Sequence, residues 1–210
     1  MENRPIFTGE RVVPNNTCHS LTFAEHMIRY SLAMRYAKVG RILDVACGTG
    51  YGLKMMGMLG AVNLSGADID KEAVDFSREF TGNWGFFKTV DFEKEDLSDI
   101  FMIGTYDLIT SFETIEHLDD PNLFLEGVEK LLAEDGKFIY SIPLANPSKF
   151  HKVVYDFESA KKLIDHYFDH EELYIQESLE IVKFERVKTN DLSNFNKRGI
   201  FIVGVCYKKQ

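Results

Sequence analysis

The chain reads Leu43-Asp44-Val45-Ala46-Cys47-Gly48-Thr49-Gly50-Tyr51-Gly52 where an apolar strand pattern changes to a helical one. The strand pattern covers Arg41–Ala46, and the helical pattern runs from Tyr51 to about Leu59. Glycines at every second position let the backbone between them approach a ligand closely. In open α/β sheets, ligands bind at this carboxyl end of a strand. The stretch therefore predicts a strand, a ligand-binding turn and a helix.

Strand and helix patterns alternate on both sides of this turn. Helical spacing precedes it from Ser20 to about Tyr36, and Asp70 is predicted to cap a later helix. Further strands are predicted at 62–68, 85–90, 106–112 and 137–142. Helices that separate these strands imply βαβ units and a mostly parallel sheet.

The alternation changes towards the C-terminal part of the chain. Asp120-Pro121 is typical of a helix start, and Gly136 is predicted to end that helix. A helix at about 157–167 is then followed by two strands, near 173–177 and at 200–207, which a polar loop joins. Two successive strands without a helix between them predict antiparallel pairing at the edge of the sheet.

The composition argues against several classes of protein. The 210 residues suit a single domain, taken as 1–210, and the formal net charge of -9 argues against nucleic acid as a partner. The three cysteines form no C-x-x-C pair, which argues against a disulfide framework or a zinc site. No apolar stretch approaches the ~20 residues that span a bilayer, and the first residues lack a signal-peptide pattern. We therefore expect a cytoplasmic protein without membrane insertion, as a monomer or homodimer.

Two classes of cofactor bind at glycine-rich turns of this kind. Dinucleotide-binding turns follow G-x-G-x-x-G, whereas here the glycines are Gly48, Gly50 and Gly52 and Leu53 follows them. Asp44, at the end of the strand, is awkward beside a pyrophosphate. It suits S-adenosylmethionine, which carries a sulfonium and an ammonium and has no phosphate. An NAD-binding oxidoreductase is therefore the less favoured alternative.

The pattern Asp44-x-x-x-Gly48-x-Gly50 resembles motif I of the class I S-adenosylmethionine-dependent methyltransferases. The family form usually has Gly where this chain has Ala46. The resemblance implies that Asp44, Ala46, Gly48 and Gly50 contact the cofactor. It also implies a doubly wound, Rossmann-like α/β fold, with a mostly parallel sheet of about seven strands and an antiparallel last strand.

Later strand ends carry further parts of the family pattern. Asp68 ends the second strand, where the family has an acidic residue that binds both ribose hydroxyls, and a carboxylate has two oxygens to accept them. The resemblance places Ile69 against the adenine, and Asp91 and Phe92, after the third strand, beside the adenine amino group. The alternatives are a helix-capping role for Asp68 and a solvated loop at Asp91.

The segment after the fourth strand, Ser111–Leu118, closely resembles the E-x-I-E-H segment of small-molecule methyltransferases. We take Glu113 as a further cofactor contact. His117 is the predicted base that removes the proton of a hydroxyl acceptor, because histidine titrates near neutral pH. His26 is the rival base and His151 a third candidate, and the structural alternative for His117 is capping or packing. No metal site is predicted.

Motifs in the N-terminal part of the chain indicate the chemical class of the methyl acceptor. Phe7–Pro14 and Glu25–Tyr30 resemble segments of methyltransferases found among surface-polysaccharide and sugar-modifying enzymes. The resemblance implies that residues 1–37 cover the cofactor, with Tyr30 in contact with it, and His26 shares a helix face with Tyr30. The predicted reaction is methyl transfer from S-adenosylmethionine to a hydroxyl of a small molecule, such as a nucleotide sugar or a glycan. A methyltransferase-like binding module without turnover is the other alternative.

Overall fold

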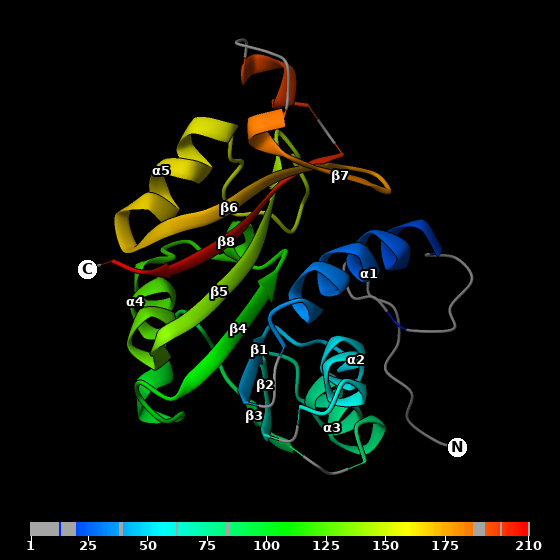
Figure 1. The fold of residues 1–210 in the computed structure, drawn as a ribbon, viewed down its shortest axis with the longest axis vertical. Helices are drawn as coiled ribbons and strands as arrows, with labels where there is room; N and C mark the ends of the chain where they lie inside the picture. The colour runs from blue at the N-terminus through cyan, green and yellow to red at the C-terminus, as the bar shows by residue number, and fades with distance from the viewer. Residues whose placement is uncertain are drawn as a thin grey trace.

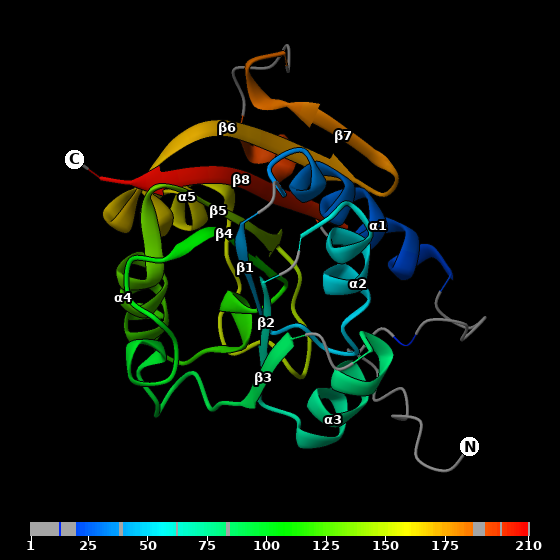
Figure 2. The same ribbon diagram turned by 60° about the horizontal axis from the view of Figure 1, so that its bottom comes forward.

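The computed structural model describes residues 13, 20–37, 40–61, 63–82, 85–186, 192–197 and 199–209. Within these residues the chain forms a mixed β-sheet with helices packed on both faces (Figure 1). Helices α1 (Ser20–Met34), α2 (Tyr51–Met58) and α3 (Lys71–Phe80) cover one face, whereas α4 (Asn122–Leu131) and α5 (Phe157–Tyr167) cover the other (Figure 2). Short 3-10 helices are η2 (Leu97–Asp99), η3 (Ile115–His117), η4 (Phe184–Arg186) and η5 (Leu192–Phe195).

The sheet has eight strands in the order β3-β2-β1-β4-β5-β8-β6-β7. Their bounds are β1 (Arg41–Val45), β2 (Asn63–Asp68), β3 (Gly85–Thr89), β4 (Tyr106–Phe112), β5 (Leu132–Leu144), β6 (Phe168–Glu177), β7 (Glu180–Lys183) and β8 (Ile200–Lys208). Strands β1 to β5 pair in parallel, and β8 runs antiparallel to both β5 and β6. The chain order reverses between β1 and β4, and such a switch point is where open α/β sheets bind ligands.

The doubly wound α/β class and the antiparallel last strand are confirmed, but the sheet has eight strands where about seven were predicted. The additional strand is β7, which pairs antiparallel with β6 at the edge of the sheet. None of its residues is buried. Because one side of an edge strand faces solvent, β7 lacks the apolar pattern that would have marked it in the sequence.

The predicted role of Gly136 as a helix terminator is wrong. Helix α4 ends at Leu131, and Gly136 lies inside β5. The pairing of β5 with β4 shifts register between Tyr106 and Leu108. A Cβ at Gly136 would lie 2.6 Å from the carbonyl oxygen of Tyr106. Glycine is needed here because the backbone of β4 approaches too closely for a side chain.

Aspartate caps set the start of two helices. Asp70 accepts a hydrogen bond from the backbone N–H of Ala73 and starts α3, as predicted. Asp156 and Ser159 form a reciprocal capping box at the start of α5. The cap at Asp70 also fixes the turn that follows β2, and Asp68 lies at that turn.

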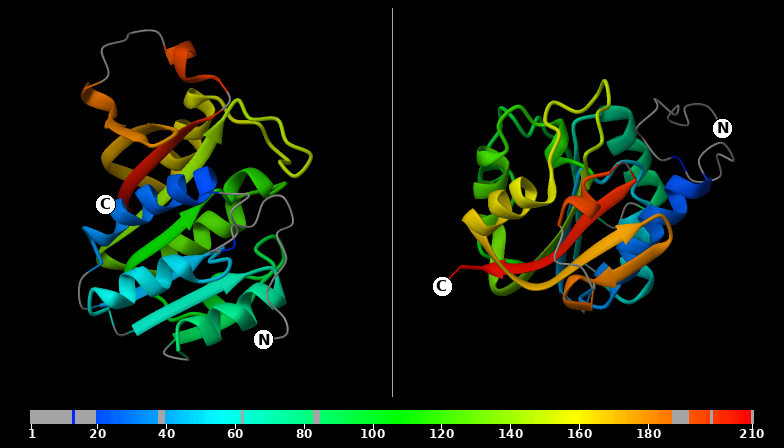
Figure 3. Two further views of the ribbon diagram at one scale, coloured as in Figure 1. Left: turned by 90° about the vertical axis from the view of Figure 1, so that its right-hand side faces the viewer. Right: turned by 90° about the horizontal axis from the view of Figure 1, so that it is seen from above.

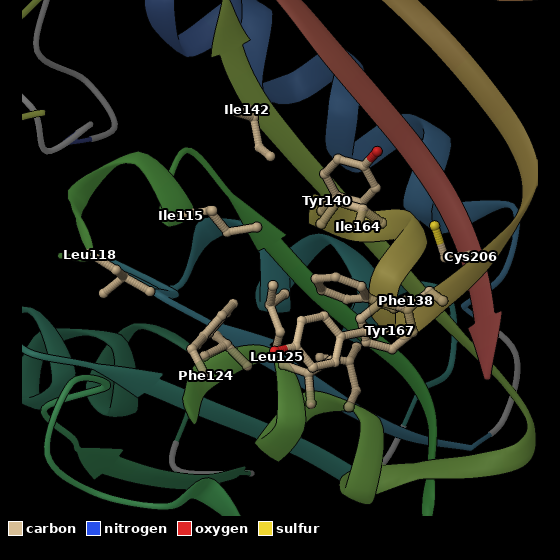
Figure 4. Close-up of a cluster of buried hydrophobic side chains, with 14 of the residues drawn as sticks. Ile115, Leu118, Phe124, Leu125, Phe138, Tyr140, Ile142, Ile164, Tyr167 and Cys206 are labelled. Carbon is tan, nitrogen blue, oxygen red and sulfur yellow. The ribbon is translucent and has the colours of Figure 1, made fainter. Parts of the chain in front are cut away.

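A buried cluster between the sheet and helices α4 and α5 anchors the segment that follows β4 (Figure 4). Ile115 and Leu118 of that segment belong to it, together with Phe124 and Leu125 of α4. Full burial of each such side chain contributes about 1.5–3 kcal/mol. The cluster therefore holds the short helix η3, which carries His117, at a fixed place beside the sheet.

Helix α1 packs against α2 and β4 on the opposite face of the sheet (Figure 3). Tyr30, Leu32 and Ala33 supply its buried apolar surface, and each is at most 6% exposed. The end of α1 that carries His26 thereby comes close to the carboxyl end of β4. None of the described helices is long and apolar enough to cross a bilayer.

Candidate active site

The glycine-rich turn adopts left-handed backbone conformations. The φ angle is +51° at Gly48 and +76° at Gly50, which is the N-cap of α2. Ala46 has a φ of +65°, a conformation that is costly for alanine. A Cβ at Gly50 would lie 2.6 Å from the Cβ of Ser77, whereas one at Gly48 would meet open space. The turn is therefore packed closely against α3 at Gly50 and open to a ligand at Gly48.

A pocket lies beside this turn, at the carboxyl ends of β1, β2, β3 and β4. Its walls are formed by Ala46, Asp68, Ile69, Asp91, Phe92, Glu93, Glu113, Thr114, His117 and Leu118. A larger cavity, ≈ 740 Å³ against ≈ 520 Å³, opens at the amino ends of β1 and β2 beside Arg41 and Asn63. Its lining contains none of the predicted site residues, and open α/β sheets bind ligands at the opposite end. The smaller pocket is therefore the candidate active site.

Asp68 joins the turn after β1 to the turn after β2. Its Oδ2 accepts a hydrogen bond of 2.8 Å from the backbone N–H of Gly48, and its Oδ1 accepts one of 2.9 Å from that of Asp70. A carboxylate has about four acceptor positions in all. Ile69, next to it, is 63% exposed although it is a large apolar residue, and it forms part of the pocket wall. A carboxylate beside an exposed apolar side chain suits a ligand that has both a diol and a flat ring.

Asp91 and Phe92 form the wall at the end of β3. Asp91 Oδ2 lies 2.6 Å from Nζ of Lys94, and Oδ1 accepts a hydrogen bond of 3.1 Å from the backbone N–H of Glu93. These contacts lower the pKa of Asp91, and the hydrogen bond with Lys94 has the largest effect. Phe92 is buried, and its ring packs against that of Phe124. Asp91 can therefore accept hydrogen bonds, and the packed ring of Phe92 fixes the backbone next to it.

Asp44 and Tyr30 lie inside the protein and outside the set of residues that line the pocket. Asp44 is fully buried and accepts hydrogen bonds from Oη of Tyr30 at 2.8 Å and Oγ1 of Thr110 at 2.6 Å. Burial raises the pKa of Asp44 to about 7, although both hydroxyls oppose the shift. Gly52 makes room for this contact, since a Cβ there would lie 2.0 Å from the ring of Tyr30. A cationic ligand beside the turn would lower the pKa of Asp44 and favour its charged form.

Glu113 binds two basic side chains of α1. Its Oε1 lies 2.7 Å from Nε2 of His26 and also accepts from the guanidinium of Arg29, which is fully buried. Burial opposes ionisation of Glu113, but Arg29 and His26 outweigh it and lower its pKa to about 2. Nδ1 of His26 lies 2.5 Å from Oη of Tyr51, and burial lowers the pKa of His26. Both ring nitrogens of His26 are therefore engaged inside the protein.

His117 stands on the pocket wall with its side chain 30% exposed. Its Nδ1 lies 3.0 Å from the carbonyl oxygen of Phe150, which accepts the proton that Nδ1 carries. Nε2 is then the nitrogen with the lone pair. The ring of His151 packs edge-to-face on that of His117, with 5.0 Å between the ring centroids. Of the three candidate bases, His117 is the one that lines the pocket.

Sequence reasoning missed several residues of this region. Arg29 received no predicted role, although a charged residue one turn before Ala33 on the buried face of α1 is a signal of an internal ion pair. Glu116 belongs to the predicted segment Ser111–Leu118 as the neighbour of His117, and its side chain is only 1% exposed. The pocket wall further contains Glu93, Thr114 and Leu118. Thr114 and Leu118 lie within the predicted segment Ser111–Leu118, whereas no pattern in the sequence distinguishes Glu93 from its neighbours.

A sequence model of the family described as "Methyltransferase domain" matches residues 23–177, which include every residue of the pocket. The chain belongs to this methyltransferase domain family. The family expected from the turn and from the motifs after β2 and β4 is therefore confirmed. In this methyltransferase domain, Arg29 and Glu113 lie within the matched range. The predicted motif Phe7–Pro14 lies before the matched range. Apart from Val13, that motif also lies outside the described residues.

Known proteins similar to this methyltransferase domain include a "Ubiquinone biosynthesis O-methyltransferase" of Actinobacillus pleuropneumoniae. It is 31% identical over 107 residues, which make up 48% of this chain and 44% of that protein. The chain spans about half the length of the curated relatives that it matches.

Solved structures show the same fold. An S-adenosylmethionine-dependent methyltransferase described as putative, from Listeria monocytogenes, superimposes with a TM-score of 0.66 at 13% identity, over 91% of this chain and 100% of that one. The N-methyltransferase NodS of Bradyrhizobium japonicum, in complex with S-adenosyl-L-homocysteine, gives 0.63 at 14% identity, over 93% and 100%. At such identities the likeness extends to the fold alone.

Proposed function

We propose that this methyltransferase domain binds S-adenosylmethionine in the pocket at the carboxyl ends of β1 to β4 and transfers its methyl group to a hydroxyl of a small-molecule acceptor. The observation that carries the proposal is the pocket wall, to which four successive strand ends contribute. The names of the relatives as O-methyltransferases and the S-adenosylhomocysteine held by NodS support it. The motifs that resemble class I methyltransferases supply the residues for each part of the cofactor.

The side chains of the pocket fit the chemistry of this cofactor. We assign the ribose diol to the carboxylate of Asp68 and the adenine ring to Ile69, with Asp91 accepting from the adenine amino group. The methionine part is assigned to the turn at Gly48 and Gly50, whose backbone is open to a ligand at Gly48. Acidic groups at the pocket, Asp68, Asp91, Glu93 and Glu113, suit a ligand with a net positive charge.

S-adenosylmethionine supplies a methyl group on a cationic sulfur: a C–O bond forms to the acceptor, the C–S bond breaks with its electron pair on sulfur, and the hydroxyl proton leaves. The tasks that remain for the chain are alignment, exclusion of water and removal of that proton. His117 is the histidine on the pocket wall, and we assign the acceptor hydroxyl to its side of the pocket. His26 holds Glu113 and α1 in place, which is a positioning role.

The proposal also concerns the chemical class of the molecule that carries the acceptor hydroxyl. The names of the relatives favour a phenolic hydroxyl, whereas the resemblance of Glu25–Tyr30 favours a hydroxyl of a nucleotide sugar or glycan. Both are small-molecule hydroxyls, so both belong in the same assay. The panel should contain simple phenols, phenols with two adjacent hydroxyls, and nucleotide sugars.

The experiment is to incubate the tag-free chain with methyl-labelled S-adenosylmethionine and this panel, and to locate the methyl group by mass spectrometry. We expect transfer to oxygen of at least one acceptor. His117→Ala should keep cofactor affinity and lose about 10²–10⁴ in turnover. His166→Ala, an exposed histidine of α5, is the control and should turn over at the native rate. Native turnover in His117→Ala, or transfer only to nitrogen or carbon, would contradict the proposal.

A further inference from the structure

Three side chains that can bind a metal meet beside the pocket. Glu116, His117 and His151 each offer a ligand atom, and these atoms lie within 4.8 Å of one another. Oε1 of Glu116 and Nε2 of His117 are 3.9 Å apart. Metal–ligand bonds of about 2.0–2.2 Å allow two ligands to be up to about 4.2 Å apart, so this pair already has a suitable separation.

Both imidazoles are oriented as metal-binding histidines are. Nδ1 of His117 lies 3.0 Å from the carbonyl oxygen of Phe150, and Nδ1 of His151 lies 2.7 Å from that of Asn146. A carbonyl accepts only from a protonated Nδ1, so each bond fixes the tautomer in which Nε2 carries the lone pair. Histidines that ligate metals are held in this way by a backbone carbonyl or a carboxylate behind the ring.

The backbone also holds the three side chains together. The segment 145–156 is closed by a hydrogen bond of 2.8 Å from the N–H of Ala145 to the carbonyl of Tyr155. The N–H groups of Lys152 and Val153 both bond to the carbonyl of Glu116, at 2.8 and 3.2 Å. These bonds fix the loop that carries His151 against η3. The site is therefore formed by two segments that are tied to each other.

We propose that Glu116, His117 and His151 bind one divalent first-row transition-metal ion at the edge of the pocket. The donor set of two imidazoles and one carboxylate suits Zn²⁺, Co²⁺ or Fe²⁺ better than Mg²⁺, which prefers oxygen ligands. A cation here is neutralised in part by the buried carboxylate of Glu116, whose side chain is 1% exposed.

The role of the ion rests on the proposed function. His117 is both a ligand and a part of the pocket wall, so the ion would lie beside the acceptor hydroxyl. A hydroxyl that coordinates a divalent cation loses its proton to water far more readily than a free one. His117 then acts on the hydroxyl through the ion, and the anionic oxygen that results is the nucleophile.

Metal binding is tested directly on the tag-free, chelator-treated chain by titration with Co²⁺, followed by its visible absorption. We expect one ion per chain. His151→Ala and the isosteric Glu116→Gln should each weaken binding at least about tenfold. His166→Ala, which removes an exposed histidine of α5, should bind Co²⁺ as the native chain does. Competition with Zn²⁺ should displace Co²⁺, and Mg²⁺ at the same concentration should not.

Absence of Co²⁺ binding to the native chain, or equal binding by His151→Ala and Glu116→Gln, would overturn the site. A second readout separates this inference from the proposed function. If the site acts as proposed, chelation lowers methyl transfer, Co²⁺ restores it, and the affinity for S-adenosylmethionine measured by calorimetry stays the same. Methyl transfer that is equal with and without metal leaves the proposed function standing and overturns the role of the ion. Specific Co²⁺ binding without any methyl transfer supports the site and contradicts the proposed function.

Discussion

Ala46 shows how a single side chain is placed under strain beside the pocket. Its φ of +65° is a conformation that costs a non-glycine residue about 1–2 kcal/mol. Glycine relieves this strain but adds about 0.4–1 kcal/mol of unfolded-state entropy. We therefore expect Ala46→Gly to raise the free energy of unfolding by about 0.5–1 kcal/mol, or the Tm by about 1–4 °C.

Calorimetric melting of Ala46→Gly checks this, with Ala160→Gly as the comparison. Ala160 is fully buried in α5, so glycine there should lower the free energy of unfolding by about 1 kcal/mol or more. If both variants were destabilised to the same extent, the strain at Ala46 would be refuted.

At the residue scale the sequence predicted the pocket better than its surroundings. Asp68, Ile69, Asp91 and Phe92 follow strand ends at family spacing, and all four line the pocket. The meeting of His151 with Glu116 depends on backbone pairing between segments 35 residues apart, and nothing in the local pattern encodes it. Local motifs therefore located residues that line the pocket, whereas the contacts between loops required the structure.

At the scale of elements, helix α1 is tied to the end of β4 by the ion pair of Arg29 with Glu113. The pKa of Glu113 is about 2 in the folded chain and about 4.3 when unfolded. A lowered folded pKa contributes stability that is present above the unfolded pKa and is lost as the pH falls towards the folded one. The loss should be about 3 kcal/mol in total, spread over the range from about pH 5 down to about pH 1.

We expect Arg29→Met to lower the free energy of unfolding at neutral pH by about 3 kcal/mol, because Glu113 loses its buried partner. The same variant should show a much smaller loss of stability between about pH 5 and pH 3. Denaturant unfolding at several pH values measures both. Glu113→Gln removes the titrating group and should abolish the same pH dependence. Arg78→Met, which breaks an exposed pair with Asp75, is the control and should leave stability nearly unchanged. An unaltered pH dependence in Arg29→Met would contradict the account.

Elements were predicted well where burial leaves an apolar pattern. Strand β4 and helix α5 have their predicted bounds, because β4 is a nearly continuous buried run and α5 places its buried residues at helical spacing. Strand β7 was missed because none of its residues is buried, and β5 was predicted too short because its first residues pair irregularly with β4. Exposed and irregular pairing leaves no periodic signal for sequence reasoning to use.

At the scale of the whole molecule, the sheet order determines which strand ends meet. The βαβ alternation predicted the parallel half, and the loss of alternation predicted an antiparallel end. The insertion of β8 between β5 and β6 was not predicted, because it depends on pairing between distant segments. The parallel half is sufficient to form the pocket, since its walls come from the ends of β1 to β4.

The central claim is that S-adenosylmethionine binds at this switch point through Asp68, and isothermal titration calorimetry of the tag-free chain tests it most directly. We predict that the native chain binds one molecule of S-adenosylmethionine, and that Asp68→Ala weakens binding about ten- to hundredfold, because it removes charge-assisted hydrogen bonds to the ribose. Asp75→Ala, which removes the same charge from the exposed surface of α3, should bind as the native chain does. Unchanged affinity in a folded Asp68→Ala variant, or no binding by the native chain, would contradict the account.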